Sequence, residues 1–83
     1  MKLGVNQLAL LRRCYLKGNI GIKDVSIYYN LRANLRNKQR LCVILEKLEI
    51  QGFLIQINQH NWKLTEQGKH VVIDYLNLKK EAI

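Results

Sequence analysis

The chain has 83 residues, which suffice for one small domain and leave little room for a second. Hydrophobic residues make up 48% of the chain, too many for a disordered tail, and no apolar run approaches the roughly 18 residues that cross a bilayer. Fourteen Lys and Arg residues against six Asp and Glu residues give a formal net charge of +8, which favours an anionic partner, nucleic acid first and an anionic membrane surface second.

Helical periodicity predicts a first helix over residues 5–17. Gly18 follows it, as expected of a residue that accepts the left-handed conformation after a last helical turn. Residues 20–22 are too short for a helix and are expected to form a brief extended segment. The predicted inward stripe of the helix consists of Val5, Leu8, Leu11 and Tyr15.

A second helix is predicted over residues 23–31, with Asp24 in its first turn, where a carboxylate favours the helix dipole. The helical pattern breaks over residues 32–36, which are therefore expected to form a turn. Leu35 is the one residue of this turn that could plug the core.

The third helix, over residues 37–51, has the clearest pattern, with Asn37 as its expected N-cap. One apolar stripe is formed by Leu41, Ile44, Leu45 and Leu48. Lys38 and Arg40 flank the opposite face, which is expected to be exposed. That face consists of Arg36, Gln39, Val43, Glu46, Lys47 and Ile50.

After Gly52 the apolar period changes from helical to two, which predicts a β-hairpin over residues 53–64 with a polar tip at 58–61. Trp62 and Phe53 are expected to pack at the root of this hairpin. Thr65 is a good N-cap for a last helix over residues 66–79. That helix is apolar on more than one face, which predicts burial on two sides.

Two segments carry a resemblance to a known family. Residues 45–54, LEKLEIQGFL, resemble the end of the recognition helix and the first wing strand of MarR-like regulators, and residues 64–69, LTEQGK, are similar to the L-T-x-x-G that follows the wing. The resemblance implies an α+β winged helix-turn-helix fold, with a three-helix core, a two-stranded wing and a C-terminal helix in one domain over residues 1–83. The wing is short and lacks the acidic-then-arginine signature often found at its tip. Compact regulators of archaea, and of their viruses or plasmids, are similar to the chain in size.

This fold and the clustered charge predict sequence-specific binding of double-stranded DNA by a transcriptional regulator. A helix such as 37–51 fits the major groove, where Gln39 could pair with adenine and Val43 could touch a thymine methyl group. The remaining candidates would contact phosphates from the turn, the helix and the wing. The full set of candidate DNA-binding residues is Arg32, Asn34, Arg36, Asn37, Lys38, Gln39, Arg40, Val43, Lys47, Asn58, Gln59, His60, Asn61 and Lys63.

The over-apolar last helix predicts a homodimer, which would read a palindromic site. The expected interface residues are Val71, Tyr75, Leu76 and Leu78. Two alternatives stay open. A winged helix can be a protein-protein interaction module, because the fold alone does not set function. The chain could also bind nucleic acid without sequence preference, as a nucleoid protein or on double-stranded RNA.

Nothing in the sequence indicates an enzyme, because the acids are scattered and no glycine-rich phosphate loop is present. No cofactor, metal or small-molecule effector is evident. Cys14 and Cys42 lack metal-ligand spacing and are expected to be buried intracellular thiols, and a disulfide is the weaker alternative. The polar start of the chain does not resemble a secretory signal, so the expected location is the cytoplasm, in association with the nucleoid.

Overall fold

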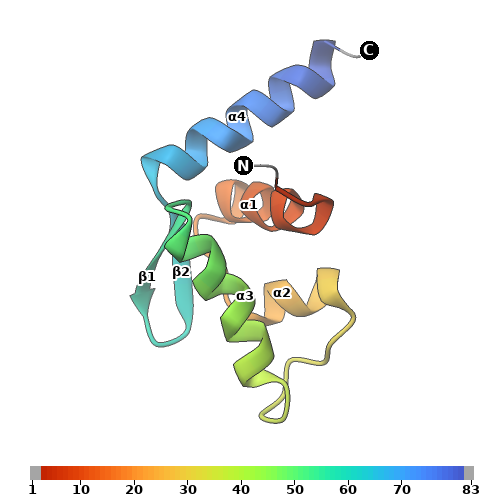
Figure 1. Cartoon of the computed structure of the whole chain (residues 1–83), viewed down its shortest axis with the longest axis vertical. Coiled ribbons are helices and arrows are strands. Elements are labelled where there is room, and N and C mark those ends of the chain that lie inside the picture. The colour runs from red at the N-terminus through yellow and green to blue at the C-terminus, as the bar shows by residue number, and fades with distance from the viewer. Residues whose placement is uncertain (1–2, 82–83) are drawn as a thin grey trace.

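The computed structural model describes residues 3–81 and, within them, the side chains of residues 3–77. Three helices, a two-stranded hairpin and a fourth helix follow one another along the chain (Figure 1). Their bounds are α1 Val5–Lys17, α2 Ile22–Tyr29, α3 Lys38–Ile50, β1 Leu54–Asn58, β2 Asn61–Leu64 and α4 Glu66–Glu81. This order and the α+β class match the prediction, and each boundary lies within two residues of the expected one.

Helices α1, α2 and α3 pack around one apolar core. From α3, Leu41, Leu45 and Leu48 are fully buried, as the stripe on this helix predicted. From α1 the buried residues are Leu10, Leu11 and Cys14. The predicted stripe on α1 is therefore partly wrong: Val5 is 82% exposed and Tyr15 is 43% exposed. The helix carries two overlapping apolar stripes, and the one that includes Leu10 and Cys14 faces the core.

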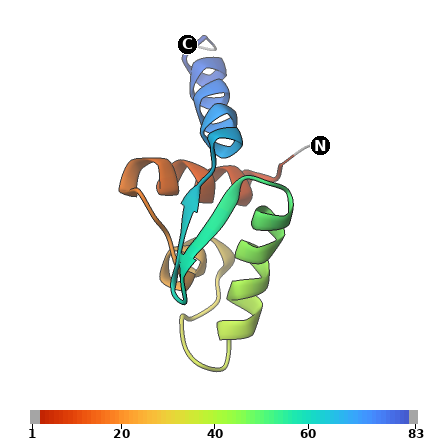
Figure 2. The same ribbon diagram turned by 90° about the vertical axis from the view of Figure 1, so that its left-hand side faces the viewer.

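The hairpin is antiparallel and contacts the helices along both strands, β1 on α3 and β2 on α1 and α4. Leu54 pairs with Leu64 and Gln56 with Trp62, and the register shifts between Gln56 and Asn58. Ile20 forms an isolated bridge to Trp62, in which each backbone N–H donates to the other residue's carbonyl at 2.8 Å. The predicted extended segment is thus confirmed at Ile20, whereas Ile22 begins α2. Figure 2 shows the hairpin beside α3, with the segment that leads into α2 along its other edge.

The junction between α3, the hairpin and α4, which we call the wing root, contains Gly52, Phe53, Leu64, Thr65 and Gly68. Gly52 has a φ of 91°, which favours glycine, and the Thr65 hydroxyl donates to its carbonyl at 2.6 Å. The same hydroxyl accepts the Gly68 N–H at 3.1 Å, so the predicted cap of α4 is confirmed. A Cβ on Gly68 would collide with the Phe53 carbonyl oxygen and lie 2.9 Å from the Leu64 side chain. The L-T-x-x-G resemblance therefore corresponds to a tightly packed joint.

Helix α4 contacts α1 and β2 near its start and then extends away from the core (Figure 1). Val72 is buried, Val71, Tyr75 and Leu76 are half-buried, and Ile73 is exposed. Leu78, the fourth expected interface residue, lies outside the described side chains. None of the helices in the described part of the chain is long and apolar enough to span a membrane.

Candidate nucleic-acid interface

The turn between α2 and α3 and the first residues of α3 form a cationic surface, which we call the cationic turn (residues 32–40). Its side chains surround a polar hollow of about 460 Å³, lined by Arg32, Asn34, Arg36, Asn37 and Arg40. All its residues except the half-buried Asn37 are exposed. Among the described residues, ion pairs form only at Asp24 and at Glu66, so no acid neutralises the arginines of the turn.

Two asparagines hold the cationic turn in shape. The Asn37 backbone N–H donates to the Asn34 carbonyl at 3.2 Å and to its Oδ1 at 3.0 Å. The Asn37 side-chain amide donates to the Arg32 carbonyl at 3.1 Å. Asn34 Oδ1 and the Asn37 side-chain amide, which the sequence predicts as DNA contacts, are thus engaged within the turn. Asn37 occupies the N-cap position of α3, as predicted, but its side chain makes no capping hydrogen bond because it reaches back to the turn.

Leu35 lies at the outside of this turn and is 90% exposed. The expectation that it plugs the core is therefore wrong. The polar bonds of Asn34 and Asn37 give the turn its shape, so no apolar anchor is needed there.

The outer face of α3 is exposed, as predicted. Gln39 and Lys47 are exposed, Val43 is 39% exposed, and Ile50 is 84% exposed. Lys38 begins the helix beside the cationic turn, where the first backbone N–H groups have no partner within the helix and face an anion favourably. This face can present side chains to base edges while the turn holds phosphates.

The wing tip is partly tied up by its own hydrogen bonds. Asn58 Oδ1 accepts from the His60 backbone N–H at 2.9 Å and from the Asn61 amide at 3.1 Å. The side chains of Gln59, His60 and Lys63 are exposed. The tip also abuts α2, since a Cβ on Gly21 would lie 2.5 Å from the His60 carbonyl oxygen. The wing is therefore held at a set position relative to the helices.

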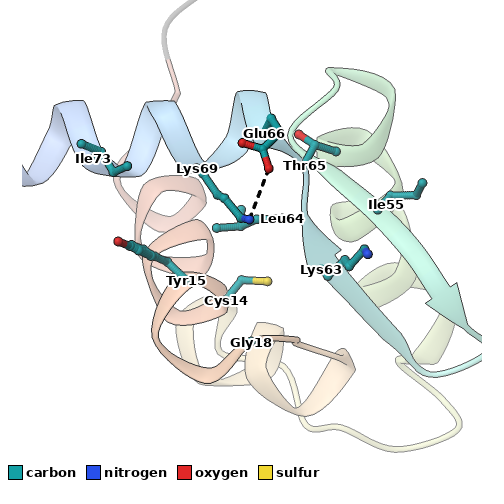
Figure 3. A pocket seen from close by; sticks show the side chains of 10 residues that line it. All are labelled: Cys14, Tyr15, Gly18, Ile55, Lys63, Leu64, Thr65, Glu66, Lys69 and Ile73. Atoms are coloured by element: carbon teal, nitrogen blue, oxygen red, sulfur yellow. Dashed lines mark hydrogen bonds and ion pairs between the residues drawn. The ribbon is translucent and has the colours of Figure 1, made fainter.

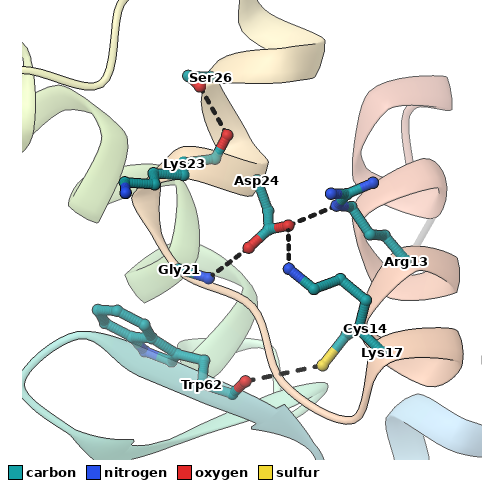
Figure 4. A network of polar contacts seen from close by, with 8 residues as sticks. All are labelled: Arg13, Cys14, Lys17, Gly21, Lys23, Asp24, Ser26 and Trp62. Carbon is teal, nitrogen blue, oxygen red and sulfur yellow. Dashed lines mark hydrogen bonds and ion pairs between the residues drawn. The ribbon is translucent and has the colours of Figure 1, made fainter.

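Asp24 is a buried charged residue that links α1 to α2, a role that the sequence did not predict (Figure 4). Its carboxylate pairs with Arg13 and, at 2.8 Å, with Lys17, and accepts the Gly21 N–H at 2.9 Å. Burial opposes ionisation, but the hydrogen bonds from Lys17, Arg13 and Gly21 outweigh it and lower the pKa of Asp24. Two basic side chains of α1 are thus occupied within the fold. The sequence offered only the position of Asp24 in a first turn, which does not reveal partners on another helix.

A separate groove of about 730 Å³ lies between α1, the outer side of the hairpin and the start of α4 (Figure 3). Tyr15, Ile55 and Ile73 line it together with Lys63 and Lys69. Lys69 interacts with Glu66 at 3.4 Å. Glu66 lines the groove as well, so its wall carries two lysines and one carboxylate beside the apolar side chains.

Neither cysteine suggests redox or metal chemistry. Both are free thiols, Cys14 buried and Cys42 half-buried. Burial raises the pKa of Cys14 to about 11, so this thiol stays protonated and unreactive near neutral pH. Within the described residues, no group of three His, Cys, Asp or Glu side chains is arranged to hold a metal ion.

Comparison with known proteins identifies the fold. No protein-family model and no curated protein sequence matches the chain. A structure of BpsR from Bordetella bronchiseptica, whose DNA binding is regulated by 6-hydroxynicotinic acid, matches with a TM-score of 0.71 and 17% identity, over 96% of this chain and 57% of that one. Ligand-free NadR matches with a TM-score of 0.74 and 19% identity, again over 96% of this chain and 57% of that one.

The chain therefore spans little more than half the length of each of these proteins. The organism named is a bacterium, which gives no support to an archaeal, viral or plasmid source. At such low identity the likeness concerns architecture, and it agrees with the helix order and hairpin described above. The predicted winged helix-turn-helix fold is confirmed.

Proposed function

We propose that the chain binds double-stranded DNA in a sequence-specific manner and regulates transcription. The observation that carries this proposal is the hollow ringed by Arg32, Arg36 and Arg40 at the start of α3, with no acid among its lining residues. One guanidinium group can donate two parallel hydrogen bonds to the oxygens of a phosphate, and the first turn of a helix adds backbone N–H donors that have no partner within the helix. BpsR, a DNA-binding protein of the same fold, supports the same reading.

In this proposal the contacts divide by role. The cationic turn and Lys38 would hold phosphates beside the major groove, and Lys63 with the wing tip would reach the flanking backbone. Gln39 would pair with adenine and Val43 would touch a thymine methyl group. Lys47, farther along α3, would add charge. No step of this function requires a cofactor, a metal or catalysis, so we propose that the chain is not an enzyme.

Charge reversal tests this proposal against a general effect of charge. Arg36→Glu should weaken binding to a duplex about tenfold or more, because it replaces a phosphate contact by repulsion. Arg12→Glu is the matched control, since Arg12 is exposed on α1 and lines a different hollow. Fluorescence anisotropy with the same duplex measures both. Equal losses in the two variants, or undiminished binding of Arg36→Glu, would contradict the proposed surface. Absence of duplex binding by the wild type would favour a protein-interaction module.

We further propose that the chain acts as a homodimer through α4. The distal part of this helix extends from the core, and Val71, Tyr75 and Leu76 are only half-buried. Burial against a second copy, with Leu78 added, would cover the apolar surface. Leu76→Asp should weaken dimerisation or folding by about 3 kcal/mol, because it buries an unpaired charge. Sedimentation across a dilution series checks the claim, and a wild-type monomer together with normal melting of the variant would contradict it.

A second candidate property is regulation by a small anionic ligand in the groove of Figure 3. The sequence alone indicates no effector, but the groove lies between the hairpin and α4 and combines apolar walls with Lys63 and with the ion pair of Lys69 and Glu66, so Lys63 is the lysine left for an anionic group. BpsR, with this fold, is regulated by 6-hydroxynicotinic acid. That compound, used as the probe, should raise the melting temperature of the wild type, and Lys63→Gln should reduce the rise. No rise at millimolar probe would contradict binding of this ligand.

A further inference from the structure

The outer face of α3 carries one acid among the residues that face away from the core, Glu46. No acidic residue occurs from Val25 to Leu45, so Glu46 is the first acid after a strongly basic stretch. Its side chain is exposed. Among the described hydrogen bonds and ion pairs none involves Glu46, whereas Asp24, Glu49 and Glu66 each have a partner within the chain. The carboxylate of Glu46 is therefore not used in a polar contact among the described residues.

Glu46 is aligned with the two side chains that we assign to base contacts. Gln39, Val43 and Glu46 have spacings of four and three residues, so they lie along one line of the helix surface. Seven residues rise about 10 Å along an α-helix, which corresponds to about three base-pair steps. Homeodomains read bases from helix positions at spacings of three, four and seven, so one recognition helix can reach this far.

The chemistry of a carboxylate restricts what Glu46 can contact on DNA. Ionised carboxylates only accept hydrogen bonds, and phosphates repel them. In the major groove, cytosine presents the N4 amino donor alone, adenine presents its N6 amino donor beside the N7 acceptor, and guanine presents two acceptors, which repel a carboxylate. A carboxylate at this place therefore favours cytosine and disfavours guanine on the strand that it faces.

We propose that Glu46 is a specificity-determining residue that accepts a hydrogen bond from the N4 amino group of a cytosine. The inference rests on the proposed DNA binding and adds a base preference to it. In this arrangement the cationic turn supplies affinity, and Glu46 lowers affinity for sequences that lack cytosine at the facing position. Such a residue opposes binding to random DNA while it selects one base.

Selection of bound duplexes from a random pool tests the inference, with wild type, Glu46→Gln and Glu49→Gln in parallel. Glu49→Gln is the matched control: it removes the same charge one turn away, but Glu49 accepts a hydrogen bond from the Gln56 backbone N–H at 3.2 Å and a glutamine oxygen can still accept it. The wild-type pool should contain cytosine at a fixed position. Glu46→Gln should shift that preference about tenfold from cytosine towards adenine at this position alone, because a glutamine amide pairs with adenine N6 and N7, and it should bind random duplex at least as tightly as wild type. Glu49→Gln should keep the preference.

The outcomes separate the inference from the function on which it rests. An unchanged preference in Glu46→Gln, or the same change in both variants, would overturn the role of Glu46 while DNA binding stands. A wild-type chain that enriches no sequence would contradict the proposed sequence-specific function, and the role of Glu46 with it. Because Glu46 is exposed, the wild-type protein and the Glu46→Gln variant should melt at the same temperature. Equal melting temperatures would exclude misfolding as the cause of a changed base preference.

Discussion

The wing root and the cationic turn both connect secondary-structure elements, and hydrogen bonds shape both. They differ in packing, because the wing root is buried and the cationic turn is exposed. At the wing root, the Thr65 hydroxyl donates to the Gly52 carbonyl, and Gly68 packs directly against the Phe53 carbonyl. The side chains of Phe53 and Leu64 are buried there. In the cationic turn the shape comes from a few amide hydrogen bonds, and the arginines and Leu35 point into solvent. The first region has no room for added atoms. The second leaves its charged groups available.

This difference assigns stability to one region and binding to the other. Substitutions in the wing root should lower the free energy of unfolding whether or not DNA is present. Substitutions of the exposed arginines of the cationic turn should leave the unfolding free energy nearly unchanged and alter affinity.

Gly68→Ala should cost about 3 kcal/mol of unfolding free energy, because its Cβ would meet the Phe53 carbonyl and the Leu64 side chain. Denaturant titration measures the loss. Gly4→Ala is the control, since the nearest atom to its Cβ would be Gln7 Oε1 at 3.7 Å, an ordinary contact. If the two variants are equally stable, the wing root is looser than described.

Asp24→Asn should cost about 2 kcal/mol at neutral pH, less than a fully buried pair, because Arg13 and Lys17 are partly exposed and keep some hydration. The pH dependence has a definite sign. The folded pKa of Asp24 lies below its ordinary value of 3.8, so ionised Asp24 stabilises the fold above that value and the contribution is lost as pH falls through the folded pKa. The stability difference between wild type and variant should therefore be complete near neutral pH and shrink in strong acid. A difference that grows on acidification would contradict the ion pairs.

Gly21→Ala should cost about 1.5 kcal/mol, because its Cβ would lie 2.5 Å from the His60 carbonyl oxygen, a backbone atom, so the wing tip would have to move away from α2. The shift should be visible as amide chemical-shift changes concentrated over residues 58–62. Changes that spread evenly through α3 would indicate that the wing tip is not the part that yields.

Leu35→Ala should change the unfolding free energy by less than about 0.5 kcal/mol, because its side chain is 90% exposed. Thermal melting of this variant beside Leu45→Ala gives the contrast, since Leu45 is fully buried and should lose about 2–5 kcal/mol. A large loss at Leu35 would mean that the turn folds against the core.

Hydrophobic periodicity was sufficient to predict the helices, the strands and the buried stripe of α3. In α3 the prediction succeeded because Leu41, Leu45 and Leu48 form a single apolar line with polar residues opposite. It was insufficient for α1, where Leu10 and Cys14 compete with Val5 and Tyr15 for the inward side and only the packing partners decide. The same limit applies to the cationic turn. Leu35 was expected inside on hydrophobicity alone, but the bonds that Asn34 and Asn37 make with the backbone determine where the turn goes.

The charge pattern before α3 predicted the exposed arginines, because a run without acids has no internal partners at short range. Contacts between distant segments could not be predicted in this way. Asp24 gains its partners from α1, and Gly21 meets the wing tip about 40 residues later, and neither spacing has a periodic signature. The choice of bases by Gln39, Val43 and Glu46 stays a prediction for the same reason, since it depends on the partner.

The most direct measurement of the central claim is the affinity of the wild-type chain for a duplex across a salt series. With about five phosphate contacts per subunit, the logarithm of the association constant should fall against the logarithm of salt concentration with a slope of about −4 to −5 per subunit. Such a slope would agree with a cationic turn seated on the DNA backbone. An affinity that does not change with salt would contradict the account.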